Sequence, residues 1–197
     1  MRCFTLLIAL TCALPGHAVL AAPVTYKIDP RHTFPTFEAD HQGGLSIWRG
    51  NIERTEGQIV LDREAKTGHV DVTMHMESVD FGLEAMNASA KSAEIFDVTK
   101  FPLAKYSGQL EDFTHDGKPT AINGSLTLHG VTRPLRLQIS RFQCQPNPRT
   151  KKEICGADAH ASFQRDEFGI DYGKDTGFFM SVKLLISVEA ARVDPNP

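Results

Sequence analysis

The stretch from Ile122 to Ser140 reads INGSLTLHGVTRPLRLQIS, and its pattern indicates the class of fold. Before Gly130, hydrophobic or small residues alternate with polar ones, and the alternation resumes a few residues after it. An alternation with a period of two is typical of β-strands that bury one face. Gly130 lies between the two runs and marks a turn. The stretch therefore predicts two strands, each with one face turned toward a core.

The same alternation recurs along most of the chain. It is clear in residues 70–76, 157–163 and 180–188. Shorter candidate strands surround Phe37, Ile52, Ile59 and Tyr106. About eight antiparallel strands in one domain can close into a barrel or stack into a sandwich. The pattern therefore predicts a single all-β domain.

A single segment departs from the strand pattern. The residues that recur there at helical spacing are Leu83, Met86, Ala90 and Ala93. Asp80 precedes them and is a candidate N-cap. We expect a short α-helix from Leu83 to Glu94, which lies over the sheet or across one end of a barrel.

The predicted inner faces mix small side chains with flexible and bulky ones. The small residues are Gly124, Ala157, Ala159 and Ala161, and the others include Met74, Met76, Met180 and Phe163. An eight-stranded barrel is just wide enough to be filled by side chains or to hold one slender ligand. Small residues leave room and methionine adapts to an irregular guest, but small and large side chains also interdigitate in a filled core. The pattern alone leaves both interpretations open.

The first 21 residues have the features of a secretory signal peptide. Arg2 precedes an apolar run from Cys3 to Ala13, and a small residue, Ala21, precedes the expected cleavage site. The run is shorter than the ~20 residues needed to span a bilayer, and no later segment reaches that length. We expect a periplasmic or secreted protein whose single domain spans residues 22–191, followed by a frayed tail at residues 192–197.

The mature chain is mildly acidic. Without Arg2 it has 20 basic and 24 acidic residues, which gives a net charge of −4 with histidine neutral. The two signs are scattered, so the chain lacks the basic patch that binds nucleic acid. The balance also disfavours adhesion to an anionic membrane surface. We therefore expect no nucleic-acid partner and no stable membrane insertion.

Two cysteines, Cys144 and Cys155, remain in the mature chain and flank a polar, loop-like segment. In an oxidising compartment, such a pair around a turn is typical of a structural disulfide. Closing this loop would stabilise the fold by about 3 kcal/mol in the chain-entropy model. The sequence has no CxxC spacing and no clustered histidines. We therefore expect a disulfide and no metal site.

Five segments, taken in order, resemble the YceI-like family of exported polyisoprenoid-binding proteins. They are YKIDPRHT (26–33), HQGGLSIWRG (41–50), EIFDVTKFP (94–102), LTLHGVTRPLRLQISR (126–141) and FQRDEFGIDYG (163–173). The match runs from about Val24 to Ala190. The resemblance implies an antiparallel, eight-stranded, lipocalin-like barrel with the short helix near the mouth of an elongated apolar channel. It also implies that this channel takes an isoprenoid chain such as a quinone tail, with no metal, no cofactor and no established catalysis.

Two features depart from the family pattern. Residues 87–91 read NASAK, where relatives commonly have a charged stretch, and the proline-rich hairpin between Cys144 and Cys155 is an addition. The first departure lies in the predicted helix near the channel. The ligand of this chain therefore need not be the same as that of its relatives.

Strand parity puts two polar residues on the predicted inner face. His41 is four residues from Phe37, and Arg165 is two residues from Phe163. Residues an even number apart in a strand point to the same face, so both polar residues face inward with these phenylalanines. An interior histidine or arginine is costly unless it has a partner. Either the two residues meet a polar headgroup near one end of the channel, or they belong to a buried hydrogen-bond network that includes a nearby aspartate.

Aromatic and methionine side chains are the other candidate ligand contacts. The aromatic residues near the ends of elements, which could gate a channel mouth or plug the barrel ends, are Trp48, Phe96, Phe101, Phe168, Tyr172, Phe178 and Phe179. The methionines expected along a lipid tail are Met74, Met76 and Met86. A useful ligand buries on the order of ten carbons, because each methylene contributes about 0.8 kcal/mol and association costs roughly 4–15 kcal/mol.

The leading hypothesis is a carrier or reservoir that holds a long isoprenoid lipid inside the barrel. The main alternative is an enzyme that acts on a lipophilic substrate there, with His41 and Arg165 as its polar groups. The sequence contains no HExxH, GxSxG, Walker or dinucleotide-binding motif. A third hypothesis is a filled barrel that acts as an interaction module. The sequence leaves open the identity of the lipid, its donor and acceptor, and whether the barrel forms a homodimer.

Overall fold

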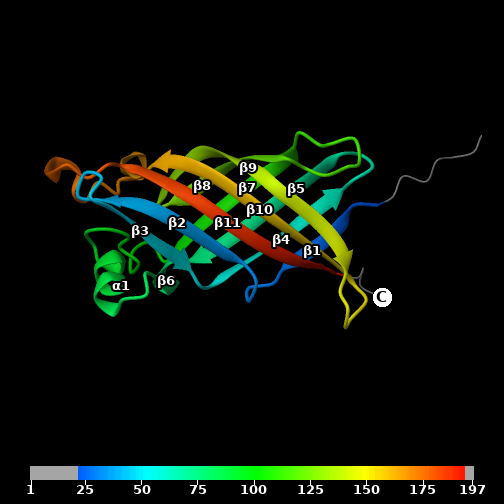
Figure 1. The fold of residues 1–197 in the computed structure, drawn as a ribbon, viewed down its shortest axis with the longest axis horizontal. Helices are drawn as coiled ribbons and strands as arrows, with labels where there is room; N and C mark the ends of the chain where they lie inside the picture. Colours follow the sequence, from blue (N-terminus) through cyan, green and yellow to red (C-terminus); the bar gives the residue numbers. More distant parts are fainter. Residues whose placement is uncertain (1–21, 194–197) are drawn as a thin grey trace, which may run out of the picture.

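The computed structural model describes residues 22–193, and Figure 1 shows them as a ribbon. The strands are β1 (Val24–Ile28), β2 (Phe34–His41), β3 (Ser46–Ile52), β4 (Thr55–Asp62), β5 (Thr67–His75), β6 (Val79–Asp80), β7 (Leu103–Glu111), β8 (Ala121–Leu128), β9 (Val131–Pro146), β10 (Glu153–Gln164) and β11 (Ser181–Arg192). The other elements are the helix α1 (Glu84–Lys91) and the 3₁₀ turns η1 (Met76–Ser78), η2 (Arg165–Phe168) and η3 (Lys174–Thr176). The predicted signal peptide and residues 194–197 lie outside the described residues. Across residues 22–193, no helix has the length and hydrophobicity that a membrane crossing requires.

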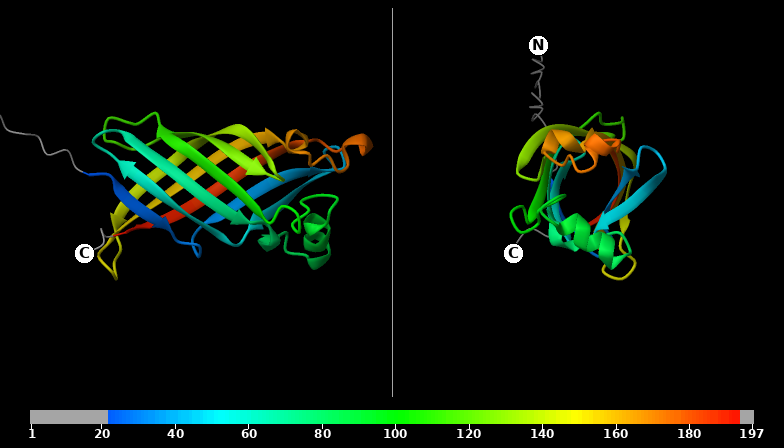
Figure 2. Two further views of the ribbon diagram at one scale, coloured as in Figure 1. Left: turned by 180° about the vertical axis from the view of Figure 1, so that it is seen from behind. Right: turned by 90° about the vertical axis from the view of Figure 1, so that its left-hand side faces the viewer.

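The sheet closes on itself into an antiparallel barrel, as predicted. β1 pairs with β4 on one side and with β11 on the other. The eight strands of the closed ring follow the order β1, β4, β5, β7, β8, β9, β10 and β11. The end-on view in Figure 2 shows this ring. Closure leaves no free strand edge within the ring. β11 continues to Arg192, one residue beyond the predicted end of the domain.

Three further strands extend the wall at one end of the barrel. β11 pairs with β1 through its last residues and with β2 through its first ones. β3 then pairs with β2, and the two-residue β6 pairs with β3. This end also carries α1 and the loop between β10 and β11, whereas the β9–β10 hairpin lies at the opposite end (Figure 1). The two ends of the barrel are therefore built from different elements.

Alternating burial separates the inner and outer faces of the barrel wall. In β7 the buried residues are Ala104, Tyr106, Gly108 and Leu110, and in β9 they are Leu135, Leu137 and Ile139. Their neighbours in the chain are mostly exposed. Most buried apolar side chains of the ring belong to one hydrophobic cluster. Removal of this apolar surface from water is the main force that favours the barrel.

The turn between β8 and β9 explains why the stretch around Gly130 forms a hairpin. Leu128 pairs with Val131, so that only His129 and Gly130 form the turn. Their φ angles are 51° and 75°, and a type I′ turn requires positive φ at both positions. A Cβ atom at Gly130 would also lie 2.6 Å from Cε1 of Phe101. Glycine is therefore needed there for its backbone angle and for space.

The helix forms where predicted, but it is shorter and begins differently. It spans Glu84–Lys91 and not the whole of the predicted range 83–94, and no side chain caps its first turn. The predicted cap, Asp80, was wrong. Its carboxylate accepts hydrogen bonds from the N–H of Gly82 at 3.0 Å and from Nδ2 of Asn87 at 2.7 Å. The positive φ of Gly82 (77°) turns the chain between Asp80 and the helix, so Asp80 binds the side of the helix and not its end.

Candidate functional site

The barrel contains an apolar cavity of about 700 Å³. Its wall is formed by the inward faces of the ring strands together with residues of β2, β3 and α1. The volume lies in the range of roughly 300–1,000 Å³ that is typical of small-molecule sites. The ionisable side chains of the wall are Asp40, His41, Tyr106, Arg165 and Tyr172. The barrel is therefore hollow, which decides between the two interpretations of its inner face that the sequence leaves open.

Most residues proposed from the sequence as ligand contacts line this cavity. They are Phe37, His41, Trp48, Met74, Met76, Met86, Phe96, Phe163, Arg165, Tyr172 and Phe178. Pro35 and Ala39 line it as well, so strand parity assigned the inner face of β2 correctly. The fold brings these side chains together from segments far apart in the sequence.

Three aromatic residues from the same set lie outside the cavity wall. The ring of Phe101 packs against His129 with a centroid distance of 4.3 Å. Phe168 is 1% exposed and lies behind Phe163, with the two ring centroids 5.2 Å apart. Phe179 is 58% exposed. These residues flank turns, where no strand period indicates which way a side chain points.

Sequence reasoning missed several wall residues, among them Phe81, Ile95 and Tyr106. The alternation of β7 could have identified Tyr106, because it shares the parity of the inward Ala104 and Leu110. Phe81 and Ile95 lie in irregular segments before and after α1. No periodic signal marks such residues.

Gly124 does not leave room for a ligand, contrary to the interpretation of the small inner residues. A Cβ atom at this position would lie 2.6 Å from the hydroxyl oxygen of Tyr106, so the phenol already occupies the space. Burial raises the pKa of Tyr106, and its protonated hydroxyl donates to the carbonyl of Leu135 at 2.9 Å. Ala157 and Ala159 do line the cavity, whereas Ala161, which was expected to do so, does not. The room therefore comes from β10 and not from β8.

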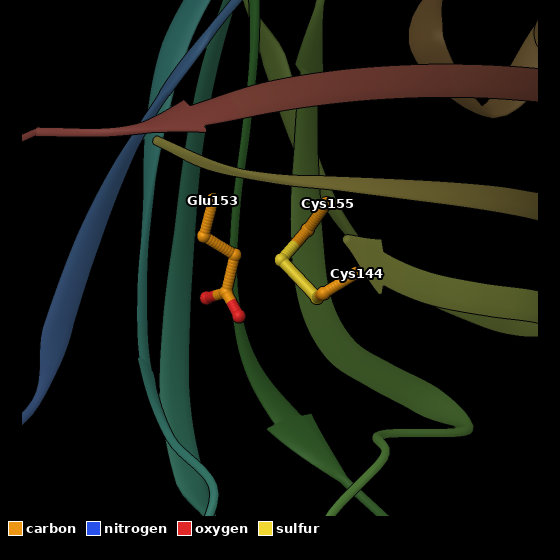
Figure 3. A group of neighbouring side chains, drawn as sticks. All are labelled: Cys144, Glu153 and Cys155. Carbon is orange, nitrogen blue, oxygen red and sulfur yellow. A yellow bond between two sulfur atoms is a disulfide. The ribbon is translucent and has the colours of Figure 1, made fainter. Parts of the chain in front are cut away.

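The disulfide between Cys144 and Cys155 forms as predicted, at the end of the barrel opposite α1. It joins directly paired positions of β9 and β10, and only residues 147–152 remain as a loop between these strands. Both sulfurs and the carboxylate of Glu153 lie within 4.8 Å of one another (Figure 3). A metal would need thiolates as ligands. Because the two sulfurs are bonded to each other, this group does not provide a metal site.

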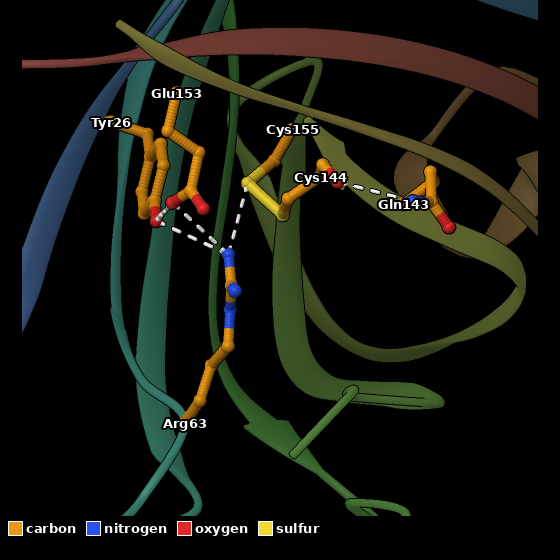
Figure 4. The surroundings of a disulfide bond; sticks show 6 residues. All are labelled: Tyr26, Arg63, Gln143, Cys144, Glu153 and Cys155. Carbon is orange, nitrogen blue, oxygen red and sulfur yellow. Dashed lines mark hydrogen bonds and ion pairs between the residues drawn. A yellow bond between two sulfur atoms is a disulfide. The ribbon is translucent and has the colours of Figure 1, made fainter. Parts of the chain in front are cut away.

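A polar network lies beside the disulfide at the same end of the barrel (Figure 4). Tyr26 is 2% exposed, and its hydroxyl donates to the carboxylate of Glu153. Nη2 of Arg63 donates to the same carboxylate at 3.1 Å and lies 3.5 Å from Sγ of Cys155. Burial and, after it, the hydrogen bond to Glu153 raise the pKa of Tyr26 to about 12. We call this end, with Tyr26, Arg63 and Glu153, the closed end.

Aromatic rings surround the cavity at the other end. The ring of His41 stacks on Trp48 with centroids 4.1 Å apart, and the edge of Phe178 approaches His41 at 5.5 Å. Tyr172 follows at 6.3 Å from Phe178. Trp48 is 37% exposed and Tyr172 is 45% exposed, although both line the cavity. The cavity therefore opens to the surface at these four residues, which we call the mouth.

Arg165 lines the cavity near the mouth, where its two terminal nitrogens each bind a backbone carbonyl. Nη1 donates to the carbonyl of Ile170 at 2.9 Å, and Nη2 donates to the carbonyl of Tyr172 at 2.6 Å. Burial lowers the pKa of Arg165, and the nearby carboxylates of Asp166 and Asp171 oppose this shift. A hydrogen-bond network, one of the two roles considered for Arg165, is present in the structure and is partly exposed. Its acceptors are backbone carbonyls and not an aspartate.

Asp40 ties two loops together at the mouth. Its carboxylate accepts hydrogen bonds from the N–H of Gly43 at 2.9 Å and of Phe179 at 2.8 Å. Burial alone would raise the pKa of Asp40, but the N–H donors of Phe179, Gly44 and Gly43 outweigh it and hold the pKa below its usual range. Gly43 has a φ of 63°, and a Cβ there would lie 2.9 Å from the carbonyl oxygen of Gly177. The β2–β3 turn therefore packs closely on the loop before β11.

The model of the YceI-like domain matches residues 26–190. The chain belongs to the YceI-like family. The YceI protein of Salmonella arizonae is 30% identical over 182 residues, which cover 90% of each chain. Two solved structures each align with a TM-score of 0.63. BcnA of Burkholderia cenocepacia is 18% identical, and the alignment covers 82% of this chain and 98% of that one. A polyisoprenoid binding domain from Saccharophagus degradans is 12% identical, with 86% and 99% covered. The YceI-like barrel that the sequence motifs predict is confirmed.

Proposed function

We propose that this YceI-like protein is an exported carrier that holds one long isoprenoid lipid inside its barrel. The supporting observation is the apolar cavity of about 700 Å³, whose wall includes the partly exposed mouth residues Trp48 and Tyr172. The polyisoprenoid binding domain from Saccharophagus degradans shares the fold and supports the same class of ligand. A periplasmic site of action agrees with the signal peptide predicted for residues 1–21.

Ligand exchange would take place at the mouth. Large apolar side chains are exposed beside it: Leu45 (73%) and Ile47 (55%) on the β2–β3 hairpin, and Leu83 (55%) before α1. Clustered apolar exposure of this kind often marks a site of interaction. A lipid that passes over these residues stays in contact with apolar surface as it enters or leaves.

A binding titration with prenols of increasing length tests the proposal. Affinity for geraniol, farnesol and geranylgeraniol should rise with each isoprene unit, because each buried methylene adds about 0.8 kcal/mol. Ala159→Leu places extra carbons in the cavity and should favour shorter prenols. His160→Leu is the matched control, because His160 is exposed on the outer face of the same strand. No binding, or an affinity independent of length, would contradict the carrier function.

The alternative function, an enzyme that uses His41 and Arg165, has less support. Both terminal nitrogens of Arg165 donate to backbone carbonyls, and the ring of His41 is stacked on Trp48. A carrier releases its lipid chemically unchanged, and His41→Ala would then alter only affinity. A modified lipid, with turnover lost in His41→Ala, would establish the enzyme instead.

A further inference from the structure

A hydroxyl in the cavity wall lacks a hydrogen-bond partner. Thr55 begins β4, is 0% exposed and lines the cavity. Its Oγ1 is buried and has no hydrogen-bond partner within the fold. Among residues 22–193, it is the buried side-chain nitrogen or oxygen atom in this state. Burial of an unpaired hydroxyl is costly, and folded proteins generally avoid it. A group from outside the chain can supply the missing partner.

Four other polar residues of the wall, Thr33, Asp40, Tyr106 and Arg165, have hydrogen-bond partners within the fold. The hydroxyl of Thr33, which is 2% exposed, lies 3.4 Å from both the carbonyl oxygen and the amide nitrogen of Glu189. Tyr106 and Arg165 donate to backbone carbonyls, and Asp40 accepts from backbone N–H groups. The unpaired state of Thr55 is therefore not a general property of this wall.

Thr55 lies partway between the mouth and the closed end. β3 begins at Ser46, five residues after the mouth residue His41, and β4 ends at Asp62 beside Arg63 of the closed end. At about 3.3 Å per residue, β4 extends roughly 23 Å from Thr55 to Asp62, and β3 covers roughly 20 Å on the side of the mouth. Its partner across the strands is Met74, which also lines the cavity. The hydroxyl thus interrupts an apolar part of the wall.

A ligand group that meets Thr55 has to be neutral. The charged side chains that line the cavity, Asp40 and Arg165, lie near the mouth, and Arg63 belongs to the closed end. Among the described residues, no cation lines the wall around Thr55. A buried phosphate at this depth would therefore lack a counter-charge, which is costly. A hydroxyl or carbonyl oxygen needs only one hydrogen bond, and threonine can supply it.

We propose that Thr55 determines ligand specificity by forming a hydrogen bond with one hydroxyl or carbonyl oxygen of a neutral long-chain lipid. The proposal rests on the carrier function and narrows its ligand class. Lipid alcohols and ketones bind in preference to hydrocarbons of the same length. A lipid phosphate binds only with its phosphate outside, at the mouth.

The test compares two probes, geranylgeraniol and the same hydrocarbon chain without its hydroxyl. Thr55→Val keeps the shape of the side chain and removes the hydrogen bond. It should weaken binding of the alcohol by about two- to tenfold and leave binding of the hydrocarbon unchanged or stronger. Thr55→Ser should retain the preference for the alcohol. Equal effects of Thr55→Val on both probes would overturn the proposal.

Stability of the lipid-free protein gives an independent readout. Thr55→Val should leave the unfolding midpoint in urea unchanged or raise it, because it removes an unpaired hydroxyl. Thr33→Val is the matched control, since it breaks contacts within the fold and should lower the midpoint and weaken both probes alike. A loss of stability in Thr55→Val as large as in Thr33→Val would overturn the proposal. Failure of the wild type to bind either probe would refute the carrier function and the role of Thr55 together.

Discussion

At the scale of single residues, the size of inward side chains decides where the barrel is solid and where it is hollow. Gly108 and Gly124 face each other across β7 and β8, and a Cβ at Gly108 would lie 2.8 Å from Cα of Gly124. Tyr106 fills the space beside them. On β10, the equally small Ala157 and Ala159 border the cavity instead. Small residues therefore support close packing in one part of the wall and ligand space in another.

Replacement of Gly124 tests this packing. In Gly124→Ala the new methyl group would collide with Tyr106 and with the backbone oxygen of Ser107 at 2.5 Å. We expect the free energy of unfolding to fall by about 1–3 kcal/mol, measured by urea denaturation. Gly156→Ala is the control, because the nearest atom to its new Cβ lies 3.7 Å away. Similar effects of the two substitutions would contradict the role of Tyr106 as the group that fills this space.

Tyr26 makes stability depend on pH at the alkaline limit. Its pKa is raised to about 12 by burial and by the hydrogen bond to Glu153, whereas an unfolded tyrosine titrates near 10. The unfolded chain therefore loses this proton first, and the free energy of unfolding falls as pH rises from about 10 to about 12. The full contribution, on the order of 2 kcal/mol, is present below pH 10.

The test compares Tyr26→Phe with the wild type. The free energy of unfolding of both proteins is measured by urea denaturation between pH 8 and pH 12. The variant should lose stability less steeply above about pH 10 than the wild type. Tyr106, whose pKa is also raised, is present in both proteins, so the difference between the two curves reports Tyr26. Parallel curves would show that the hydroxyl of Tyr26 does not titrate differently in the folded state.

At the scale of elements, the disulfide joins the two strands of the β9–β10 hairpin near the closed end. Replacement of Cys144 and Cys155 by serine should lower the free energy of unfolding by about 3 kcal/mol, as measured by urea denaturation. Lipid affinity should change little, because the bond lies at the end opposite the mouth. Reduction of the wild type provides the control and should reproduce the loss. A large loss of affinity with little loss of stability would contradict this assignment.

Asn87 connects α1 to the barrel. It is 7% exposed, its Oδ1 accepts from the N–H of Phe81 at 2.7 Å, and its Nδ2 donates to Asp80. Asn87→Ala should cost about 1–3 kcal/mol, because it leaves a backbone N–H without its acceptor. Amide hydrogen exchange should then become faster in α1, while exchange in the ring strands changes less. Glu84→Gln, an exposed change in the same helix, should leave exchange nearly unchanged.

The strands and the inner wall could be predicted from the sequence because a period of two links each residue to its neighbours. Phe37 fixed the orientation of β2, and His41 followed from it correctly. The same logic fails where the chain is irregular, as at Phe81 and Phe101. The partners of Arg165 could not be predicted either, because its acceptors are backbone carbonyls that only the folded loop brings within reach. The polar role of Asn87 depends in the same way on contacts across a turn.

At the scale of the whole molecule, the barrel combines a closed end with an open one. At the closed end, the hydroxyl of Tyr26 and the guanidinium of Arg63 bind the carboxylate of Glu153 beside the disulfide. The mouth is built from aromatic side chains and is flanked by α1 and by exposed apolar residues. A lipid would enter and leave by the same route. Binding would also stabilise the fold in proportion to the logarithm of lipid concentration.

The most direct test of the account is chemical analysis of what the protein carries. The protein would be purified from the cells that naturally produce it in detergent-free buffer, extracted with organic solvent and examined by mass spectrometry. The account predicts about one long-chain isoprenoid lipid per protein molecule, with a neutral oxygen-bearing group. An empty extract, together with no uptake of added polyprenol, would contradict it.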